Sequence, residues 1–445
     1  MNIITVNNFT AHKQKTNPFQ GKVLKFKTPA FGAITAADTS EKRPLVIISD
    51  LWWPHTSGVV VSTANIAKSL KNKGYHVKVI SPDGITDNFD EKCPKSNDGS
   101  CFKYIKSDLL YGGDLHFCID IGNKNKEKLR KMLVKLKPIA IYNTTEGSLG
   151  LHLNKILENK DIPYMTSYLT NWTDYVNKRV KICSNFVRIE VSQFLKNFHN
   201  KPSKVMVTTP TMKKELLKIG IKRDKPDNIV IIPRGVDLNL FKPDLRDEKF
   251  TFVDSQNSRK TASRKGMKVI IGYVGRVSVE KNLDELLELT KTKDKKINNG
   301  NYKIVIIGKP TDDEYLNNLR IKYPNAIFTG PKSGEELAKH YANLDVFAFP
   351  STVDTFGVVQ LEALACGTPV AAHDVQGPKD IIGGKNVGSL NEDLSQAISN
   401  LLNQDQDLLR KNCREFVEKN YSWDKTADLI AANLDKIDEK KLSNL

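Results

Sequence analysis

The sequence predicts an α/β protein built from two Rossmann-like, doubly wound domains that face a common cleft. Its 445 residues are too many for one hydrophobic core, because cores stop growing at roughly 250–300 residues. Short apolar runs of strand length alternate with helix-length segments between residues 45 and 232, and again between 269 and 373. Residues 243–266 are polar, lack apolar periodicity and separate the two series as a linker or long surface loop. Alternating strands and helices form a parallel sheet covered on both faces, so two series indicate two domains.

The first series begins with the apolar run LVIISD at 45–50, which is typical of a buried parallel strand. A Gly-containing turn, a helix over 60–73 and a strand at 76–81 follow, which together predict a βαβ unit. Further strands are predicted at 139–143, 164–168, 204–208 and 229–232, with helices at 147–158 and 211–219.

The second series repeats this alternation after the polar linker. Its strands are predicted at 269–274, 303–308, 326–329, 346–350 and 369–373, and its helices at 283–291, 312–322, 334–342 and 358–366. We therefore expect an irregular N-terminal extension at 1–43, an N-terminal domain at 44–235, a C-terminal domain at 236–425 and a C-terminal helix or tail at 426–445.

Composition indicates a cytoplasmic protein. No run reaches the ~18 consecutive apolar residues that a membrane span needs, and the N-terminal segment lacks the apolar region of a signal peptide. Six cysteines in a chain of this length favour reduced thiols, with a Cys93–Cys101 disulfide as the minor alternative. The other four are Cys118, Cys183, Cys366 and Cys413.

The positive charge is confined to the first half of the chain. Residues 1–235 carry 38 basic and 20 acidic side chains, whereas the remainder carries 30 and 31. Such asymmetry favours a lobe that meets an anionic surface or acceptor. A general solubility bias explains the same numbers, so both interpretations remain open.

The segment at 347–373 has the pattern of a ligand site. A predicted strand ends at Pro350, a polar loop carries Asp354, and a helix beginning near Gly357 presents Glu362. Gly357 lets the backbone approach a ligand closely. The free N–H groups of the helix start suit a diphosphate. A carboxylate there would repel phosphate, so Asp354 and Glu362 are better placed for sugar hydroxyls.

A second pattern follows the strand at 269–274. Arg276 and Lys281 stand five residues apart on a predicted strand-to-helix turn. Arginine offers a bidentate fork and lysine a point charge, and together they can flank a leaving diphosphate. Two solvated surface bases would look the same in isolation. The position of the pair before the Asp354–Glu362 element favours the functional interpretation.

Together these motifs resemble the retaining glycosyltransferases of family 4, which have the GT-B fold. The resemblance rests on G-R-x4-K at 275–281, on acid-x7-Glu at 354–362, and on the A-x-A-x-G-x-P-V that follows. It covers roughly residues 45–425. It implies catalytic roles at the donor for Arg276, Lys281, Asp354 and Glu362. It also implies donor-binding positions at Gly58, Gly275, Phe328, Gly330, Thr355, Phe356 and Gly357.

Within the family the chain resembles the branch that glycosylates lipids, including glycolipid mannosyltransferases and sulfoquinovosyltransferases. TEGSLG at 145–150, SYLTNW at 167–172 and DTFG at 354–357 carry this likeness. It implies acceptor-side positions at Glu146, Thr170, Asn171 and Tyr175. The family usually has a histidine where this chain has Leu169, and leucine can neither donate a hydrogen bond nor carry charge. We expect Arg234 and Asp237, in the segment RGVD, to be structural.

The resemblance implies transfer of a mannose- or glucose-type sugar from a GDP- or UDP-sugar to a lipid or glycan, with retention of configuration. It implies no protein nucleophile, no cofactor and no required metal. Preorganised cations at the leaving diphosphate would serve the reaction. The basic segment KNKEKLRKMLVKLK at 124–137 has one apolar stripe, which can lie on an anionic membrane or pack on its own lobe. The first alternative predicts peripheral attachment to the cytoplasmic face.

Two other functions are weighed against this one. The substitution at Leu169 is compatible with a catalytically impaired sugar-nucleotide-binding protein. The net charge of +17 is compatible with a nucleic-acid-binding protein, but no RNA- or DNA-binding module is recognisable, so no nucleic acid is expected as a partner. A dinucleotide oxidoreductase and a P-loop NTPase are disfavoured, because neither G-x-G-x-x-G after a first strand nor G-x4-G-K-[ST] occurs.

Overall fold

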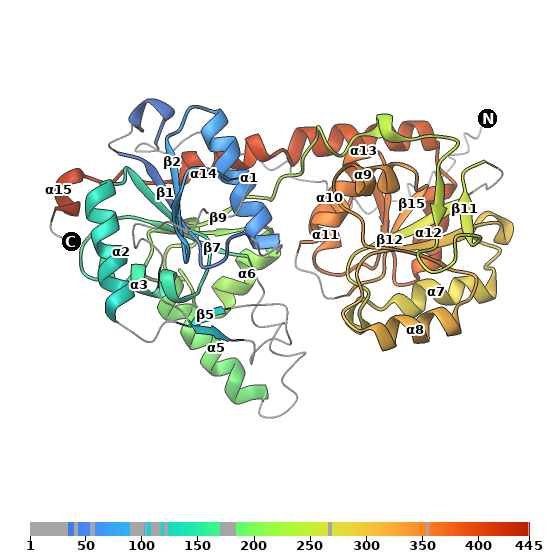
Figure 1. Ribbon diagram of the computed structural model, residues 1–445, viewed down its shortest axis with the longest axis horizontal. Coiled ribbons are helices and arrows are strands. Elements are labelled where there is room, and N and C mark those ends of the chain that lie inside the picture. Colours follow the sequence, from blue (N-terminus) through green and yellow to red (C-terminus); the bar gives the residue numbers. More distant parts are fainter. Residues whose placement is uncertain are drawn as a thin grey trace, which may run out of the picture.

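Two α/β lobes lie side by side in the computed structural model (Figure 1). The structure describes residues 34–39, 43–53, 58–89, 102, 105–107, 117–119, 123–169, 184–265, 269–352, 356–443 and 445, with the backbone alone at 105–107, 117–119 and 184–188. Short 3-10 helices occur at Ala36–Asp38, Pro226–Asn228, Pro243–Leu245, Val279–Lys281 and Asn298–Gly300.

The N-terminal lobe is built on a seven-stranded sheet in the order β3-β2-β1-β6-β7-β8-β9. All neighbouring strands are parallel except β3, which runs antiparallel to β2. The strands are β1 (Leu45–Ile48), β2 (Val77–Ser81), β3 (Gly84–Thr86), β6 (Ala140–Asn143), β7 (Met165–Tyr168), β8 (Lys204–Val207) and β9 (Ile229–Ile231). Helices α1 (Gly58–Asn72), α2 (Asn123–Leu136), α3 (Ser148–Leu157), α5 (Ser184–His199) and α6 (Pro210–Lys218) accompany it, with a separate antiparallel pair, β4 (Ile105–Ser107) and β5 (Phe117–Ile119).

The C-terminal lobe contains a six-stranded parallel sheet in the order β14-β13-β12-β15-β16-β17. Its strands are β12 (Ile270–Val274), β13 (Lys303–Ile307), β14 (Ile327–Gly330), β15 (Val346–Phe349), β16 (Val370–Ala372) and β17 (Gly388–Leu390). Its helices are α7 (Leu283–Thr292), α8 (Asp313–Lys322), α9 (Gly334–Ala342), α10 (Val358–Ala365), α11 (Pro378–Ile382), α12 (Leu394–Leu402) and α13 (Gln406–Asn420). The strand order reverses between β12 and β15, and in such sheets ligands bind outside the carboxyl ends of the strands at that point.

Part of the predicted linker is a hairpin that belongs to the C-terminal lobe. β10 (Thr251–Val253) pairs antiparallel with β11 (Thr261–Ser263). Phe252 and Ala262 are buried in the core of the lobe, and the carboxylate of Asp254 accepts a hydrogen bond from the backbone N–H of Phe328 at 2.9 Å. The prediction of an irregular segment is therefore wrong here. Each strand buries one apolar side chain, too few to create a visible periodicity.

The apolar stripe of the basic helix α2 faces its own lobe. Leu129 and Leu133 are buried, and Met132 and Leu136 pack against the same core cluster. The packing alternative is therefore the observed one for this stripe, and the exposed lysines of α2, Lys124, Lys131 and Lys135, remain on the outside. Within the described ranges, no helix combines the length and hydropathy of a bilayer span. Cys366 and Cys413 are free, and the side chains of the other four cysteines lie outside the described residues.

The C-terminal end of the chain returns to the N-terminal lobe. After α13, helix α14 (Trp423–Asn433) crosses to the N-terminal lobe and packs along α1 (Figure 1). Ala427, Ile430 and Leu434 enter the core cluster that contains Ala64 and Leu70 of α1. The short helix α15 (Glu439–Leu442) contributes Leu442 to a second cluster of this lobe. The sequence predicts helical structure here but not the lobe that it contacts.

Replacing Ile430 by alanine should destabilise the N-terminal lobe. Ile430 is fully buried between α14 and α1, and Ile→Ala in a core typically costs about 2–5 kcal/mol. Urea unfolding followed by tryptophan fluorescence would report on this lobe, because Trp52, Trp53 and Trp423 belong to its core cluster.

Asp428→Ala is the matched control on the same helix. Asp428 is exposed and pairs with Lys73 at the surface, an interaction worth about 0–1 kcal/mol. Equal losses in the two variants would show that α14 does not form part of the core of this lobe.

Candidate active site

Three glycines form the carboxyl edge of the C-terminal sheet beside β12. Gly275, Gly308 and Gly330 follow or end β12, β13 and β14, with φ angles of 153°, 158° and 76°. A Cβ atom on Gly308 would stand 1.8 Å from the carbonyl oxygen of Gly275, and one on Gly275 would stand 2.5 Å from Tyr273 Oη. The sequence analysis singled out Gly275 and Gly330 but missed Gly308, although a glycine directly after a predicted strand was a usable signal.

Arg276 and Lys281 lie on the turn that leaves this edge toward α7. The carbonyl of Arg276 accepts a hydrogen bond from Tyr273 Oη at 2.9 Å, which fixes the backbone at the start of the turn. The Arg276 side chain is half exposed and lies 3.6 Å from the carboxylate of Glu280. An exposed pair of this kind is worth about 0–1 kcal/mol, so the guanidinium can exchange Glu280 for an anionic ligand at little cost.

A partly buried acid accepts hydrogen bonds at the far end of the same turn. Glu285 Oε2 accepts hydrogen bonds from Asn282 Nδ2 at 2.6 Å and from His373 Nε2 at 2.9 Å. Asn282 directly follows Lys281 and has a left-handed backbone with φ of 52°. The hydrogen bond to Glu285 raises the pKa of His373. These hydrogen bonds therefore connect the turn to the end of β16. The sequence did not predict this connection.

Glu362 lies on α10, which follows β15 at the neighbouring strand end. Its Oε2 accepts a hydrogen bond from the buried hydroxyl of Tyr341 at 2.8 Å. Burial raises the pKa of Glu362 to about 7. Gly357 caps the helix with φ of 74°, and a Cβ there would lie 2.5 Å from Gln360 Nε2. Asp354 and Thr355, the two predicted partners in the loop, lie outside the described residues.

Two aromatic residues that were predicted to bind the donor have side chains packed in the core of the C-terminal lobe. Phe356 is buried and packs its ring against Tyr421. Phe328 is also buried: its N–H donates to Asp254, and its carbonyl accepts from Ser255 and Arg320. The backbone N–H and carbonyl of Phe328 thus already have partners within the lobe.

The N-terminal lobe presents the start of α1 at the opposing edge. Gly58 is the first residue of this helix, and its carbonyl accepts a hydrogen bond from Ser62 Oγ at 2.6 Å. Asp50, directly after β1, accepts from the backbone N–H of Leu149 at 2.7 Å and so caps α3. Burial raises the pKa of Asp50. A side chain at Gly147 would collide with this carboxylate at 2.4 Å.

The structure describes only some of the predicted acceptor-side residues. Glu146 points to the interior, where its Oε1 lies 3.4 Å from Nε2 of the buried His199. His199 Nδ1 in turn lies 3.0 Å from Thr166 Oγ1. Leu169 is buried in the lobe core, and His199 is too deeply buried to replace the family histidine from a surface. Thr170, Asn171 and Tyr175 lie outside the described residues.

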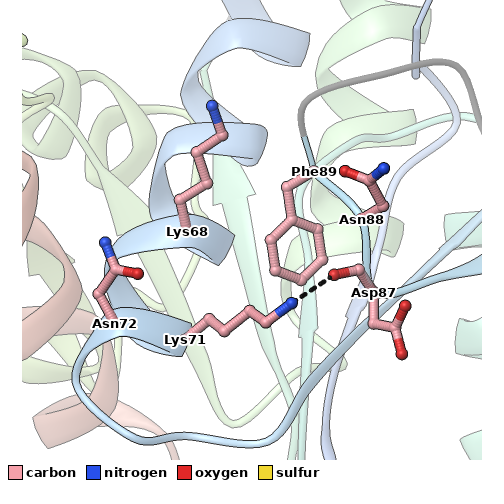
Figure 2. A pocket seen from close by; sticks show the side chains of 6 residues that line it. All are labelled: Lys68, Lys71, Asn72, Asp87, Asn88 and Phe89. Atoms are coloured by element: carbon pink, nitrogen blue, oxygen red, sulfur yellow. Dashed lines mark hydrogen bonds between the residues drawn. The ribbon is translucent and has the colours of Figure 1, made fainter.

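A separate hollow lies at the other end of α1, away from Gly58. It has a volume of about 400 Å³ and is lined by Lys68, Lys71, Asn72, Asp87, Asn88 and Phe89 (Figure 2). Lys71 donates to the carbonyl of Asp87 at 3.0 Å and lies over the ring of Phe89. The carboxylate of Asp87 pairs with Lys78. These contacts hold the loop after β3 against α1 and do not belong to the carboxyl edge.

The two lobes touch through α6 and α11. Thr211 Oγ1, in the first turn of α6, donates to Asp380 Oδ1 of α11 at 2.9 Å. Within the described part of the chain, no three acidic, histidine or cysteine side chains gather as metal ligands. The candidate site consists of the cations after β12, the partly buried acid after β15 and the glycine edge between them.

Two family models match the chain, one over each lobe. The model for "Glycosyltransferase Family 4" matches residues 56–240 and that for "Glycosyl transferases group 1" matches residues 254–423. A GDP-mannose-dependent alpha-mannosyltransferase of Corynebacterium glutamicum is 33% identical over 342 residues, 76% of this chain and 75% of that protein.

Two further matches agree with these family models. The alpha-monoglucosyldiacylglycerol synthase of Streptococcus pneumoniae is 27% identical over 79% of this chain and 76% of its own length. The structure of a sucrose-phosphate synthase from Thermosynechococcus elongatus superposes with a TM-score of 0.60 at 20% identity, covering 87% of this chain and 97% of that one. This last likeness supports the two-lobed fold.

The raised pKa of Glu362 predicts a pH-dependent stability of the C-terminal lobe. The folded state keeps the Glu362 proton up to a pH of about 7, whereas the unfolded chain loses it near 4.3. The unfolded state therefore binds fewer protons in this window, and stability falls as pH rises through it. Glu362→Gln removes this titration and should gain up to about 3 kcal/mol on the wild type between pH 5 and 8, at ~1.4 kcal/mol per pKa unit.

Calorimetric unfolding of both proteins across this pH range would measure the difference. Glu336→Gln, on the exposed face of α9, is the control and should follow the wild type. If the stability difference between the Glu362→Gln variant and the wild type stays constant with pH, the raised pKa of Glu362 in the folded state is contradicted.

The His373–Glu285 pair also predicts that the stability of the lobe falls as pH rises, although the titrating group is here a base. Its raised pKa means that the stabilisation is complete below the ordinary histidine value of about 6.5 and is lost as pH rises through the folded value. His373→Gln should therefore destabilise the lobe more at pH 6 than at pH 8.5. NMR titration of the imidazole should give a pKa that falls to its ordinary value in Glu285→Gln, and an unchanged titration would disprove the coupling.

Proposed function

The chain belongs to glycosyltransferase family 4, and on that premise we propose that it transfers a mannose- or glucose-type sugar from a GDP- or UDP-sugar to a lipid or glycan. One observation carries this proposal. The Arg276–Lys281 turn and Glu362 are about eighty positions apart in the sequence, yet they follow β12 and β15, which pair directly. Cations that suit a diphosphate and an acid that suits hydroxyls therefore follow the two strands between which the strand order reverses. Open α/β sheets bind ligands at such a point.

The cations supply the charge stabilisation that the reaction needs. As the glycosidic bond to the nucleotide breaks, negative charge grows on the diphosphate and positive charge grows on the sugar ring. Arg276 and Lys281 are anchored at the strand end by Tyr273 and through Asn282 and Glu285. Preorganised donors of this kind are typically worth ~2.7–4 kcal/mol each. With this role filled by side chains, the proposed reaction requires no metal.

Glu362 accepts hydroxyl groups of the donor in this mechanism. Its pKa of about 7 means that a bound hydroxyl competes with a proton for the carboxylate. Tyr341 occupies one oxygen and so directs the other toward the ligand. We propose retention of configuration without a protein nucleophile, as the family resemblance implies, with Asp354 in the loop beside the sugar.

The N-terminal lobe is proposed to receive a lipid acceptor at an anionic membrane surface. Support comes from the excess of basic residues in the first 235 positions and from the relative named for synthesis of a glucosyldiacylglycerol. Lys124, Lys131 and Lys135 of α2 are exposed. Because the apolar stripe of α2 is buried, attraction would be electrostatic and should weaken with salt.

A donor panel tests the proposal directly. GDP-mannose, UDP-glucose, UDP-galactose and UDP-N-acetylglucosamine would each be assayed for binding by calorimetry and for slow hydrolysis. One donor should bind and turn over. Glu362→Ala should lower kcat/KM at least about tenfold, since a lost charged hydrogen bond costs roughly 1.5–3 kcal/mol, whereas Glu336→Ala should leave it unchanged.

The outcomes separate the competing functions. Binding without turnover in the presence of diacylglycerol or glycan acceptors would favour the impaired sugar-nucleotide binder, with Leu169 as the residue to exchange for histidine. Absence of binding by every donor would sink the assignment of residues 275–362 as a donor site.

A further inference from the structure

Arg234 lies in the segment that connects the two lobes, with its backbone held on both sides. The carbonyl of Pro233 accepts a hydrogen bond from Thr426 Oγ1 of α14 at 2.8 Å. Gly235 approaches Trp423 so closely that an added Cβ would stand 2.4 Å from the Trp423 backbone nitrogen. The next residue, Val236, donates its N–H to the carbonyl of Tyr421. Helix α14 and the residues before it therefore fix the place from which the Arg234 side chain extends.

The guanidinium of Arg234 has no partner among the described residues. Its Nε is buried without a hydrogen bond, and no carboxylate of the described part of the chain lies within ion-pair distance. Burial lowers the pKa of this guanidinium to about 10. Other partly buried arginines of the chain differ in this respect: Arg246 pairs with Asp345 at 2.6 Å and Arg320 with Asp254 at 2.8 Å. A partly buried cation that lacks a partner among the described residues does not stabilise the folded state, so Arg234 does not serve the fold through its charge.

The same guanidinium lies at the ligand-binding edge of the N-terminal sheet. Its Nη1 is 3.4 Å from the position that a Cβ on Gly58 would occupy, so it lies beside the first residue of α1. Its charge also acts on the phenol of Tyr142 in β6. β1, which precedes α1, and β6 are neighbouring parallel strands, and the strand order of the N-terminal sheet reverses between them. Open α/β sheets bind ligands outside the carboxyl ends of the strands at such a point.

We propose that Arg234 binds a phosphate-type oxyanion of a substrate at this edge, beside the start of α1. The planar fork of arginine matches two oxygens of such a group. The inference rests on the proposed function, which supplies two sources of this chemistry: the diphosphate of the donor and the phosphorylated headgroup of an acidic lipid acceptor. In both cases the ligand neutralises a charge that has no partner among the described residues.

Arg234→Met tests the proposal, because a binding role and a structural role predict opposite changes in stability. Methionine keeps the apolar contacts and removes the unpaired charge, so the midpoint of thermal unfolding should stay the same or rise. The affinity for the anion should fall at least about tenfold, because a charge-assisted hydrogen bond is typically worth roughly 1.5–3 kcal/mol. Arg234→Lys should recover part of that affinity. Arg223→Met, at an exposed position of the same lobe, is the matched control and should change neither property.

Three probes, GDP, UDP and glycerol 3-phosphate, identify the source of the anion by isothermal calorimetry. Weaker binding of GDP or UDP to Arg234→Met would assign Arg234 to the donor diphosphate. Weaker binding of glycerol 3-phosphate alone would assign it to an acceptor headgroup. Unchanged affinity for all three probes, no binding of any of them to the wild type, or a lowered unfolding midpoint with unchanged affinity would overturn the proposal. If the wild type still turns over a donor in a Glu362-dependent manner, the failure concerns Arg234 and not the proposed function.

Discussion

Strand β12 pairs in parallel with β13 on one side and with β15 on the other, and the geometry of the C-terminal lobe follows from that pairing. Parallel strands align their carboxyl ends, so the turn after β12 and helix α10 after β15 meet at one edge. The edge tolerates no side chain at Gly275 or Gly308, since added Cβ atoms would collide with Tyr273 or with the facing backbone. In the proposed function, a ligand approaches the backbone itself at this edge.

Polar groups at this edge are held by partners from elements distant in the sequence. Tyr341 holds Glu362, and His373 holds Glu285. Such contacts offset the cost of removing polar groups from water and also fix the orientation of each side chain. Arg234 is the contrasting case, because its guanidinium is partly buried and unpartnered within the described residues. In our proposal, a substrate anion supplies the missing partner at that position.

Helix α14 joins the two lobes more closely than their separate sheets suggest. It continues from the C-terminal lobe, buries Ile430 against α1 and accepts the connecting segment around Gly235. Together with the hydrogen bond between Thr211 and Asp380, this contact limits how the lobes can move.

Sequence patterns alone predict the two series of strands and helices, the cations after β12 and the acid on α10. These features depend on periodicity and on spacings of a few residues, which a linear pattern records. Such patterns do not determine the β10–β11 hairpin, the lobe that α14 covers, or the pairs Tyr341–Glu362 and His373–Glu285. Those contacts join positions up to hundreds of residues apart, and each side chain alone is compatible with many partners. Whether a charge such as Arg234 is paired or left for a ligand depends on what packs around it, which only the tertiary structure decides.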